Sequence, residues 1–188
     1  MRPVFDPETL TDIVRRHVDK PIESQFPALI GDLDRAYPGA ITDHDQWVFS
    51  NAGGIMCKFL LLHASLGEYL MICGTPFGSE GHSGRHRCDL WDTVLAGELR
   101  TYQEHEMRAQ VHLPGACSHL PRGQANGSRM CDDTWLLEYC RGPVPAMLPF
   151  GLLDAFSSTL DTVGIRDTFA VYTRLTLRAL GRRVNQLR

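Results

Sequence analysis

The chain has 188 residues, of which 43% are hydrophobic and 22% are charged, a balance typical of globular proteins. This length is enough for one domain that buries about two-thirds of its unfolded surface and encloses a cavity. The formal net charge of −3 argues against nucleic acid as a partner. No run of about 18 apolar residues is present, so the sequence predicts no membrane-spanning helix. The six cysteines form no CxxC pair, which favours reduced thiols in a cytosolic compartment.

We expect three successive regions within a single domain covering residues 1–188. Residues 1–40 are predicted to form an N-terminal helical cap, because apolar side chains recur at helical spacing from residue 7 to 37, with breaks expected at Pro21 and Pro27. Residues 41–142 contain short apolar runs separated by turn residues, which indicates a small barrel or a sandwich. The sequence therefore predicts a mainly β fold with flanking helices (α+β), with strands at 47–49, 59–62, 69–72, 109–113 and 134–140.

The third region, residues 143–188, shows helical spacing again. Its two apolar stripes, at 152–163 and 165–179, are expected to form two helices joined at Gly164. The second helix carries arginines at 166, 174, 178, 182, 183 and 188. A basic amphipathic helix is a common design for lying on a membrane surface. The alternative is an ordinary solvated face on a helix that packs against the core, and the helix alone favours that alternative.

A carboxylate stands in the expected strand at 134–140, where a hydrophobic side chain would be typical. Alternation places Glu138 on one face with Leu136 and Cys140, and the opposite face is also apolar. A strand buried on both faces holds a carboxylate only if the group is neutralised, paired or hydrogen-bonded. The alternative is an edge strand from which Glu138 reaches water.

Asp92 is the second carboxylate in an apolar setting. An extended chain from residue 90 to 94 points Asp92 the same way as Leu90 and Val94. If Asp92 and Glu138 share one interior, they hold a single proton between them at neutral pH, because like charges at close range raise one pKa. Such a pair supplies a general acid and a general base together. Two unrelated surface acids are the alternative.

Other catalytic patterns receive less support. His82, His86 and Cys88 suggest a metal site, but their spacing matches no helical HExxH pattern, and a glycine-rich bend with structural histidines is favoured. Residues 74–81 lack the GKS/T end of a phosphate-binding loop, and no GxSxG motif is present. We therefore expect no metal and no other cofactor.

Five segments carry a specific resemblance: QWVFSNAGG (46–54), LHASLGEY (62–69), GHSG (81–84), WLLEYCRG (135–142) and PAMLPFG (145–151). Together they resemble the family of fungal sterol C-8 isomerases and sigma non-opioid receptors, and the match runs colinearly from Phe5 to Leu180. The stretch at 149–161 looks closer to the isomerases. Family members usually begin with a membrane-spanning helix, and this chain starts just after that helix would end. We therefore expect either a natively peripheral membrane protein or one from which that helix was removed.

The resemblance implies a cupin-like β-barrel around an elongated hydrophobic pocket, with N-terminal helices and two C-terminal amphipathic helices that face a membrane. It implies a catalytic role for Glu138 with Asp92 as its partner, and a hydrogen bond from Tyr69 to the glutamate. Assembly as a homotrimer is also implied. The other implied substrate-binding positions are Ile55, Phe59, Leu61, Met71, Leu90, Leu148 and, in a loop whose length differs by one residue, His119.

The activity that the resemblance implies is a cofactor-independent isomerase that moves a sterol ring double bond from carbons eight and nine to carbons seven and eight. The alternatives are an isomerase or cyclase acting on another isoprenoid, and a non-catalytic ligand-binding protein like the sigma receptor. All three predict a hydrophobic small-molecule ligand, and the first predicts lipophilic amines as inhibitors. The expected location is the cytoplasmic side of a membrane, which is the endoplasmic reticulum if the organism is eukaryotic.

Overall fold

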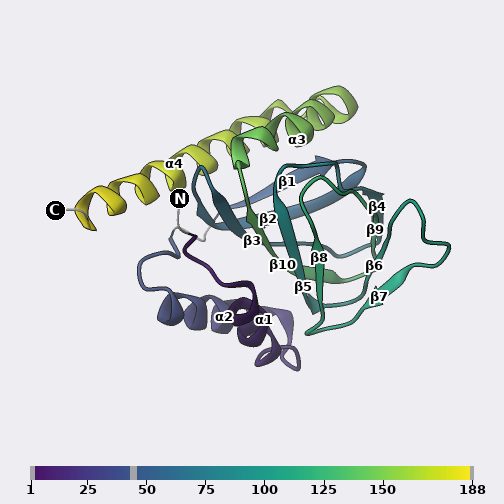
Figure 1. Cartoon of the computed structure of the whole chain (residues 1–188), viewed down its shortest axis with the longest axis horizontal. Helices are drawn as coiled ribbons and strands as arrows, with labels where there is room; N and C mark the ends of the chain where they lie inside the picture. The colour runs from purple at the N-terminus through teal and green to yellow at the C-terminus, as the bar shows by residue number, and fades with distance from the viewer. Residues whose placement is uncertain (1–2, 43–45, 187–188) are drawn as a thin grey trace.

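The computed structural model describes residues 3–42 and 46–186, and it shows two antiparallel sheets with helices on two sides (Figure 1). The larger sheet has the strand order β1 (Trp47–Ala52), β2 (Ile55–Ala64), β3 (Glu68–Thr75), β10 (Thr134–Arg141), β5 (Asp89–Ala96) and β8 (Cys117–Leu120). The smaller sheet has the order β4 (Ser79–His82), β9 (Gly127–Met130), β6 (Leu99–Tyr102) and β7 (Gln110–His112). Within the described residues the strands thus form two separate hydrogen-bonded sheets rather than one closed ring.

The two N-terminal helices cover the outer face of the larger sheet. Helix α1 (Pro7–Arg15) begins at Asp6, whose side chain accepts a hydrogen bond from the Thr9 backbone N–H at 2.9 Å. Helix α2 (Ile22–Ala36) continues through Pro27, so the break expected at this proline is wrong. Because Pro27 lies in the second turn, the helix loses one backbone hydrogen bond there. Buried apolar side chains from both helices pack against the sheet and hold α2 in place.

A buried carboxylate ties the start of the chain to this sheet. Glu68 is 2% exposed, and its two oxygens accept hydrogen bonds from the Val4 N–H at 2.8 Å and the Phe5 N–H at 3.4 Å. The Tyr139 hydroxyl donates a third hydrogen bond at 2.9 Å. The residues that precede α1 are therefore fixed against β3 and β10 by a largely buried polar network.

The C-terminal helices are divided at a different position from the one expected. Helix α3 (Leu148–Asp154) continues into a π-helical turn, η2 (Ala155–Thr159), and Leu160 then adopts a left-handed backbone with φ of 53°. Helix α4 (Thr162–Gln186) follows. The break therefore lies at Leu160, and the junction expected at Gly164 is wrong. Gly164 belongs to the first turn of α4, where its N–H donates to the side chain of Asp161 at 2.9 Å.

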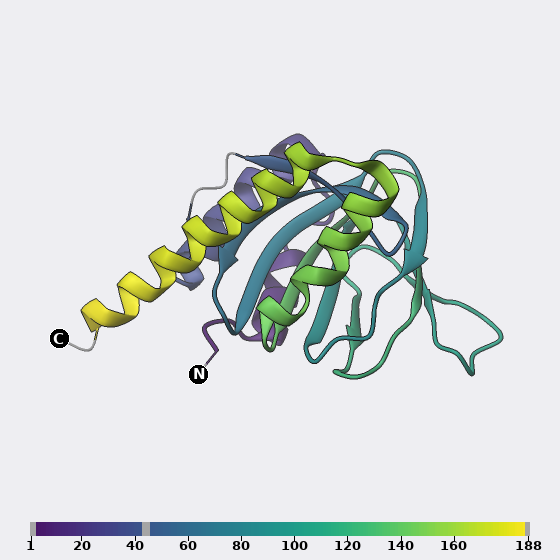
Figure 2. The same ribbon diagram turned by 90° about the horizontal axis from the view of Figure 1, so that it is seen from above.

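Helix α4 packs one stripe against the larger sheet and leaves another outside. Val171, Leu175 and Ala179 are buried, and Val171 and Leu175 belong to an apolar cluster with residues of β1 and β2. Figure 2 shows α3 and α4 side by side above the strands, with the C-terminal part of α4 extending past them. Of the arginines expected on this helix, Arg188 lies outside the described residues. No helix in the described chain is both long enough and apolar enough to cross a membrane.

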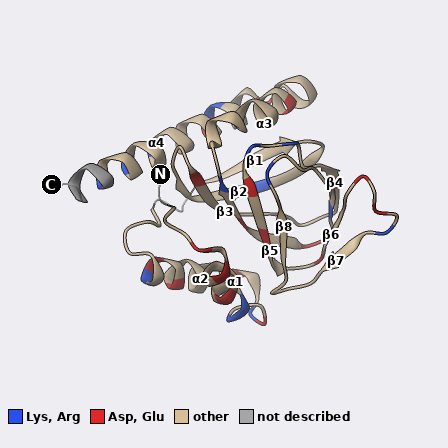
Figure 3. Ribbon diagram, in the orientation of Figure 1, with Lys and Arg blue, Asp and Glu red and all other residues tan. Residues whose placement is uncertain are grey.

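The charged residues are unevenly spread over these layers. Figure 3 shows many of them on α1 and α2, whereas long stretches of the central strands carry none. Lys58 is an exception on β2, and its ammonium lies 5.0 Å from the ring centre of Trp47 and 5.2 Å from that of Trp135. Both tryptophans are on the outer side of the sheet, so Lys58 points away from the interior, as its alternation with Phe59 predicts.

Candidate active site

A cavity of about 590 Å³ lies between the two sheets and beneath α3 and α4. This volume is within the range of small-molecule sites in proteins, about 300–1,000 Å³. Most of its wall is apolar, and its polar groups come from strands, loops and the C-terminal helices. The cavity wall includes all but one of the expected site residues, namely Ile55, Phe59, Leu61, Tyr69, Met71, Leu90, Asp92, Glu138 and Leu148.

Glu138 and Asp92 lie directly opposite each other on neighbouring strands. Strand β10 is an interior strand between β3 and β5, so the edge-strand alternative for Glu138 is wrong. In the β10–β5 ladder, Glu138 pairs with Asp92, and both side chains line the cavity. Directly opposed residues of antiparallel strands have Cβ atoms about 5 Å apart. The sheet therefore places the two carboxyl groups side by side in an apolar interior.

Strand β3 supplies hydrogen-bond donors to Glu138. The Tyr69 hydroxyl donates to Glu138 Oε1 at 2.5 Å, and the Cys73 thiol lies 3.7 Å from Oε2. Asp92 differs, since its Oδ1 atom is buried and has no hydrogen-bond partner among the described residues. Both oxygens of Glu138 therefore have donors from β3, whereas Oδ1 of Asp92 has none.

This difference shifts the pKa values of the two carboxyls to different extents. Burial raises the pKa of Asp92 well above its usual value, and the neighbouring charge of Glu138 raises it further. Burial also raises the pKa of Glu138, but the hydrogen bonds from Tyr69 and Cys73 oppose that shift. A shared proton is therefore more stable on Asp92, and the negative charge is more stable on Glu138.

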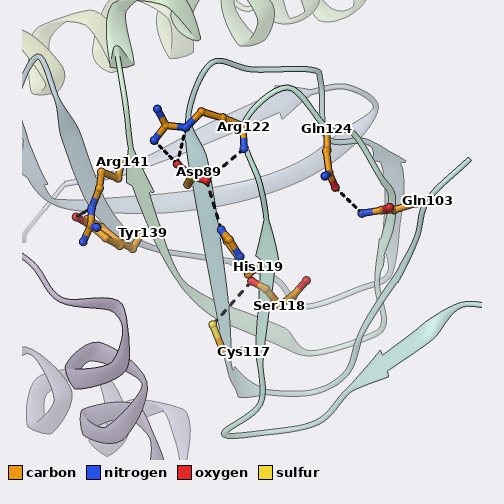
Figure 4. Close-up of polar contacts among 9 residues, drawn as sticks. All are labelled: Asp89, Gln103, Cys117, Ser118, His119, Arg122, Gln124, Tyr139 and Arg141. Atoms are coloured by element: carbon orange, nitrogen blue, oxygen red, sulfur yellow. Dashed lines mark hydrogen bonds and ion pairs between the residues drawn. The ribbon is translucent and has the colours of Figure 1, made fainter.

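His119 lies outside this cavity, so its expected position in the pocket is wrong. Its ring stacks on Trp91 with centroids 4.6 Å apart and planes 6° apart, and its Nε2 atom is 3.5 Å from Asp89, which also pairs with Arg122 (Figure 4). Alternation along β8 turns His119 outward, and the next residue, Leu120, lines the cavity. Because side chains alternate between the two faces of a strand, an alignment error of one residue in this loop assigns His119 to the inner face that Leu120 occupies.

The histidines of the glycine-rich bend also have structural contacts. His82 Nδ1 accepts a hydrogen bond from the Gly84 N–H at 2.9 Å, and His86 Nε2 lies 3.0 Å from the Ser83 carbonyl oxygen. Both histidines border the cavity. In the part of the chain that the structure describes, no group of three or more His, Cys, Asp or Glu side chains is arranged to hold a metal ion.

Several cavity residues were not anticipated from the sequence. Cys73 and Leu136 are buried on β3 and β10, and both share the inner face with Glu138. Alternation from Glu138 identifies Leu136, and alternation from Met71 identifies Cys73, so period-two spacing was an available signal. Tyr172 from α4 has no such signal, because its position depends on how the helix docks.

Comparison with known proteins places the chain in a family. Residues 2–183 match the family described as "ERG2 and Sigma1 receptor like protein". The chain belongs to this family. It is 38% identical over 172 residues to sigma non-opioid intracellular receptor 1 of Gallus gallus, a match that covers 90% of this chain and 78% of the relative. It is 37% identical over 162 residues to C-8 sterol isomerase erg2 of Aspergillus fumigatus, covering 84% and 68% of the two chains.

Comparison with solved structures gives partial matches with TM-scores below 0.5. KdgF from Halomonas sp. gives a TM-score of 0.46 at 16% identity, covering 54% of this chain and 92% of that chain. An RmlC-like cupin from Shewanella frigidimarina gives a TM-score of 0.44 at 18% identity, covering 55% and 89%. Because the relatives include proteins named as receptors and proteins named as isomerases, membership of the family leaves catalytic activity open.

The hydrogen bond from Tyr69 generates a first prediction. Tyr69→Phe removes a donor that stabilises ionised Glu138, so the pKa of Glu138 should rise by about one unit or more, given the strength of hydrogen bonds to charged groups. Infrared titration of the carboxyl bands, assigned with Glu138→Gln, measures this shift. Tyr172→Phe is the matched control, because the Tyr172 hydroxyl also borders the cavity but donates to the Ser65 carbonyl oxygen at 3.0 Å. An equal titration in the wild type and Tyr69→Phe would contradict the assigned role.

Proposed function

We propose that this protein is a cofactor-independent double-bond isomerase of the sterol C-8 isomerase type. The observation that carries the proposal is the in-register pair of Glu138 and Asp92 within an apolar cavity. A hydrophobic cavity suits a sterol or another isoprenoid, and two carboxyls with different proton affinities suit proton addition at one carbon and proton removal at the next. The relatives named as C-8 sterol isomerases support this choice of reaction.

The proposed reaction moves one proton in and one proton out. Asp92 donates its proton to one carbon of the ring double bond, and a tertiary carbocation forms at the other carbon. Glu138, ionised and held by Tyr69, stabilises the cation and then accepts a proton from the adjacent carbon, which forms the new double bond. The apolar wall excludes water that would add to the cation. One carbon–hydrogen bond forms and one breaks, so the reaction needs no oxidation or reduction.

Removal of either carboxyl should abolish this chemistry. Glu138→Gln and Asp92→Asn should each lower turnover by about two to four orders of magnitude while the protein stays folded, because each removes a proton-transfer group. Gas chromatography with mass spectrometry of a sterol that carries the 8,9 double bond measures conversion. Asp89→Asn is the control on the same strand, since Asp89 faces Arg122 and His119 outside the cavity. Near-wild-type turnover in a folded Glu138→Gln protein would disprove the assignment.

A non-catalytic ligand-binding function is the second candidate, because other relatives are named sigma non-opioid receptors. Both candidates require a cavity that accepts lipophilic cations, since an ammonium group mimics the carbocation and pairs with Glu138. Only the isomerase also requires that such a ligand inhibits a double-bond shift. The homotrimer that the resemblance implies stays a prediction for either function.

Amine binding therefore distinguishes the two candidates. A hydrophobic tertiary amine should bind, and Glu138→Gln should weaken binding by about 2 kcal/mol or more, because the buried ammonium loses its counter-ion. Affinity should fall as the pH drops through the raised pKa of Glu138, since protonation neutralises the carboxylate. Isothermal titration calorimetry gives Kd, and the sterol assay gives inhibition. Binding that is tight and pH-dependent in a protein with no isomerase activity would favour the receptor-like function.

We also propose that the α3–α4 face lies on a membrane surface. Leu153, Phe156, Leu160 and Val163 are each more than half exposed, as is Leu177. Arg166 is exposed on the same helix pair, where it forms an ion pair with Asp167 at 2.8 Å, and exposed arginines suit anionic headgroups. Several large exposed hydrophobic residues on one helix pair are typical of an interaction surface rather than of a water-facing one.

Liposome binding tests this surface. The protein should sediment with anionic liposomes, and binding should weaken at high salt because arginines contribute. Leu153→Asp combined with Phe156→Asp should reduce the bound fraction by about tenfold or more, since each change replaces buried lipid contact by a charge. Met107→Asp is the control, because Met107 is 94% exposed on the hairpin between β6 and β7. Equal binding by the double variant and the wild type would contradict the proposal.

A further inference from the structure

The proposed isomerase reaction leaves the carboxyl pair in the wrong state for the next turnover. After one cycle Asp92 has lost its proton to the product, and Glu138 has gained one from the substrate. A proton must therefore reach Asp92 and another must leave Glu138. Direct transfer between the carboxyls is one way to reset the pair, and exchange with water is the other. Water has no access through the apolar cavity while a hydrophobic ligand fills it.

A second cavity lies next to the first and is polar. It has a volume of about 170 Å³, which is room for several water molecules. Its wall comes mainly from β6, β7 and β8, and its polar groups include Thr101, Gln103, His112 and Ser118. Leu120 and Asn126 border both cavities, so these two residues form a shared partition.

Ser118 connects the polar cavity to the carboxyl pair. In the β5–β8 ladder Asp92 pairs with Ser118, so Glu138, Asp92 and Ser118 form one row across three neighbouring strands. Ser118 is 8% exposed and lines the polar cavity. In Figure 4 its side chain and that of His119 leave β8 in different directions. The Oδ1 atom of Asp92 is buried and has no hydrogen-bond partner in the described chain, and the β5–β8 register sets it beside Ser118, which separates Asp92 from this cavity.

The remaining groups of the polar cavity can continue a chain of proton donors and acceptors. Thr101 Oγ1 and His112 Nε2 are 3.0 Å apart on the paired strands β6 and β7. Burial lowers the pKa of His112, so its imidazole is neutral at neutral pH and has one donor and one acceptor nitrogen. Near the rim the Gln103 side chain donates to Gln124 Oε1 at 2.9 Å (Figure 4).

We propose that the polar cavity is the route by which Asp92 regains a proton from solvent, with the Ser118 hydroxyl as the proton relay at its inner end. Ser118 is opposite Asp92 in the β5–β8 ladder without a hydrogen bond to its Oδ1 atom, so a bridging water completes the route. The Ser118 hydroxyl takes up a proton from cavity water as it passes its own proton through that bridging water to the Asp92 carboxylate. Glu138 releases its proton to water when the product leaves the apolar cavity. One proton enters and one leaves in each cycle, and no oxidant or cofactor takes part. This inference rests on the proposed isomerase reaction for the reason that Asp92 needs a new proton. The path of that proton, from solvent through the polar cavity to Asp92, does not depend on the reaction.

The test compares Ser118→Val with Ser118→Thr, which have nearly the same shape and differ in the hydroxyl group. With unlabelled sterol in heavy water, the wild type and Ser118→Thr should incorporate a solvent deuterium in every turnover. Ser118→Val should keep a normal first turnover but then slow by about tenfold or more, as expected for the loss of a proton-transfer group. Its later product should contain less deuterium, because protons taken from the substrate are reused.

Two outcomes would overturn the proposal. Identical rates and deuterium content in Ser118→Val and Ser118→Thr would show that the hydroxyl is not used. Wild-type product that is unlabelled after the first turnover would show direct transfer between the carboxyls.

A measurement without turnover separates this inference from the proposed function. The apolar cavity is filled with a saturated hydrocarbon, and the protein is mixed rapidly with heavy water. The carboxylic acid band of Asp92, assigned with Asp92→Asn, then reports deuterium exchange by infrared spectroscopy. Exchange should be at least about tenfold slower in Ser118→Val than in Ser118→Thr, in keeping with the rate effects of single proton-transfer groups. Equal exchange would reject the route, whether or not the protein isomerises sterols.

Discussion

The candidate site depends on the alignment of three strands around one buried carboxylate. Glu138 stands on β10, its hydroxyl and thiol donors stand on β3, and its carboxyl partner stands on β5. Moving a charge into an apolar interior costs many kcal/mol unless donors meet it. A slip of either ladder by one residue would turn those partners to the opposite face of the sheet. The register of the central strands is thus both a packing requirement and an electrostatic one.

The two faces of the larger sheet contribute differently to the register of its central strands. The outer face packs against α1 and α2 through a continuous apolar cluster, and the Glu68 network fixes the chain that leads into α1. This packing holds β3, β10 and β5 in register from one side. The inner face is therefore free to leave space for a ligand and to carry the two carboxyls, whose burial destabilises the ligand-free protein.

Much of the fold was predictable, because alternation and helical spacing are local signals. The strands around Trp47, Leu60, Leu70 and Trp135 are long and apolar, and the sequence identifies them. Strands β4, β6, β8 and β9 have four residues each and mix glycine, histidine, serine and arginine, so they show no alternating pattern. These strands form because they pair with segments that are distant in the sequence. Such pairing cannot be read from the residues of the strand alone.

The errors at the helices and at His119 have the same origin. Leucine rarely adopts a left-handed backbone, so nothing in the sequence signals the break at Leu160, whereas Gly164 looks like a natural end. In the site, the inner-face spacing identified Glu138 and Asp92 as candidates, but only the β10–β5 ladder brings them together. The polar cavity could not be foreseen, because it is formed between β8 of one sheet and β6 and β7 of the other.

Helix α3 borders the cavity without being packed into a core. None of its seven residues is buried, although several of them form the cavity wall. The inner side of this helix thus lacks the packing partners that a core normally supplies, and a bound hydrophobic molecule would supply them. Such a ligand acts as a removable part of the hydrophobic core. If the cavity holds such a ligand, its occupancy stabilises α3 by supplying those contacts.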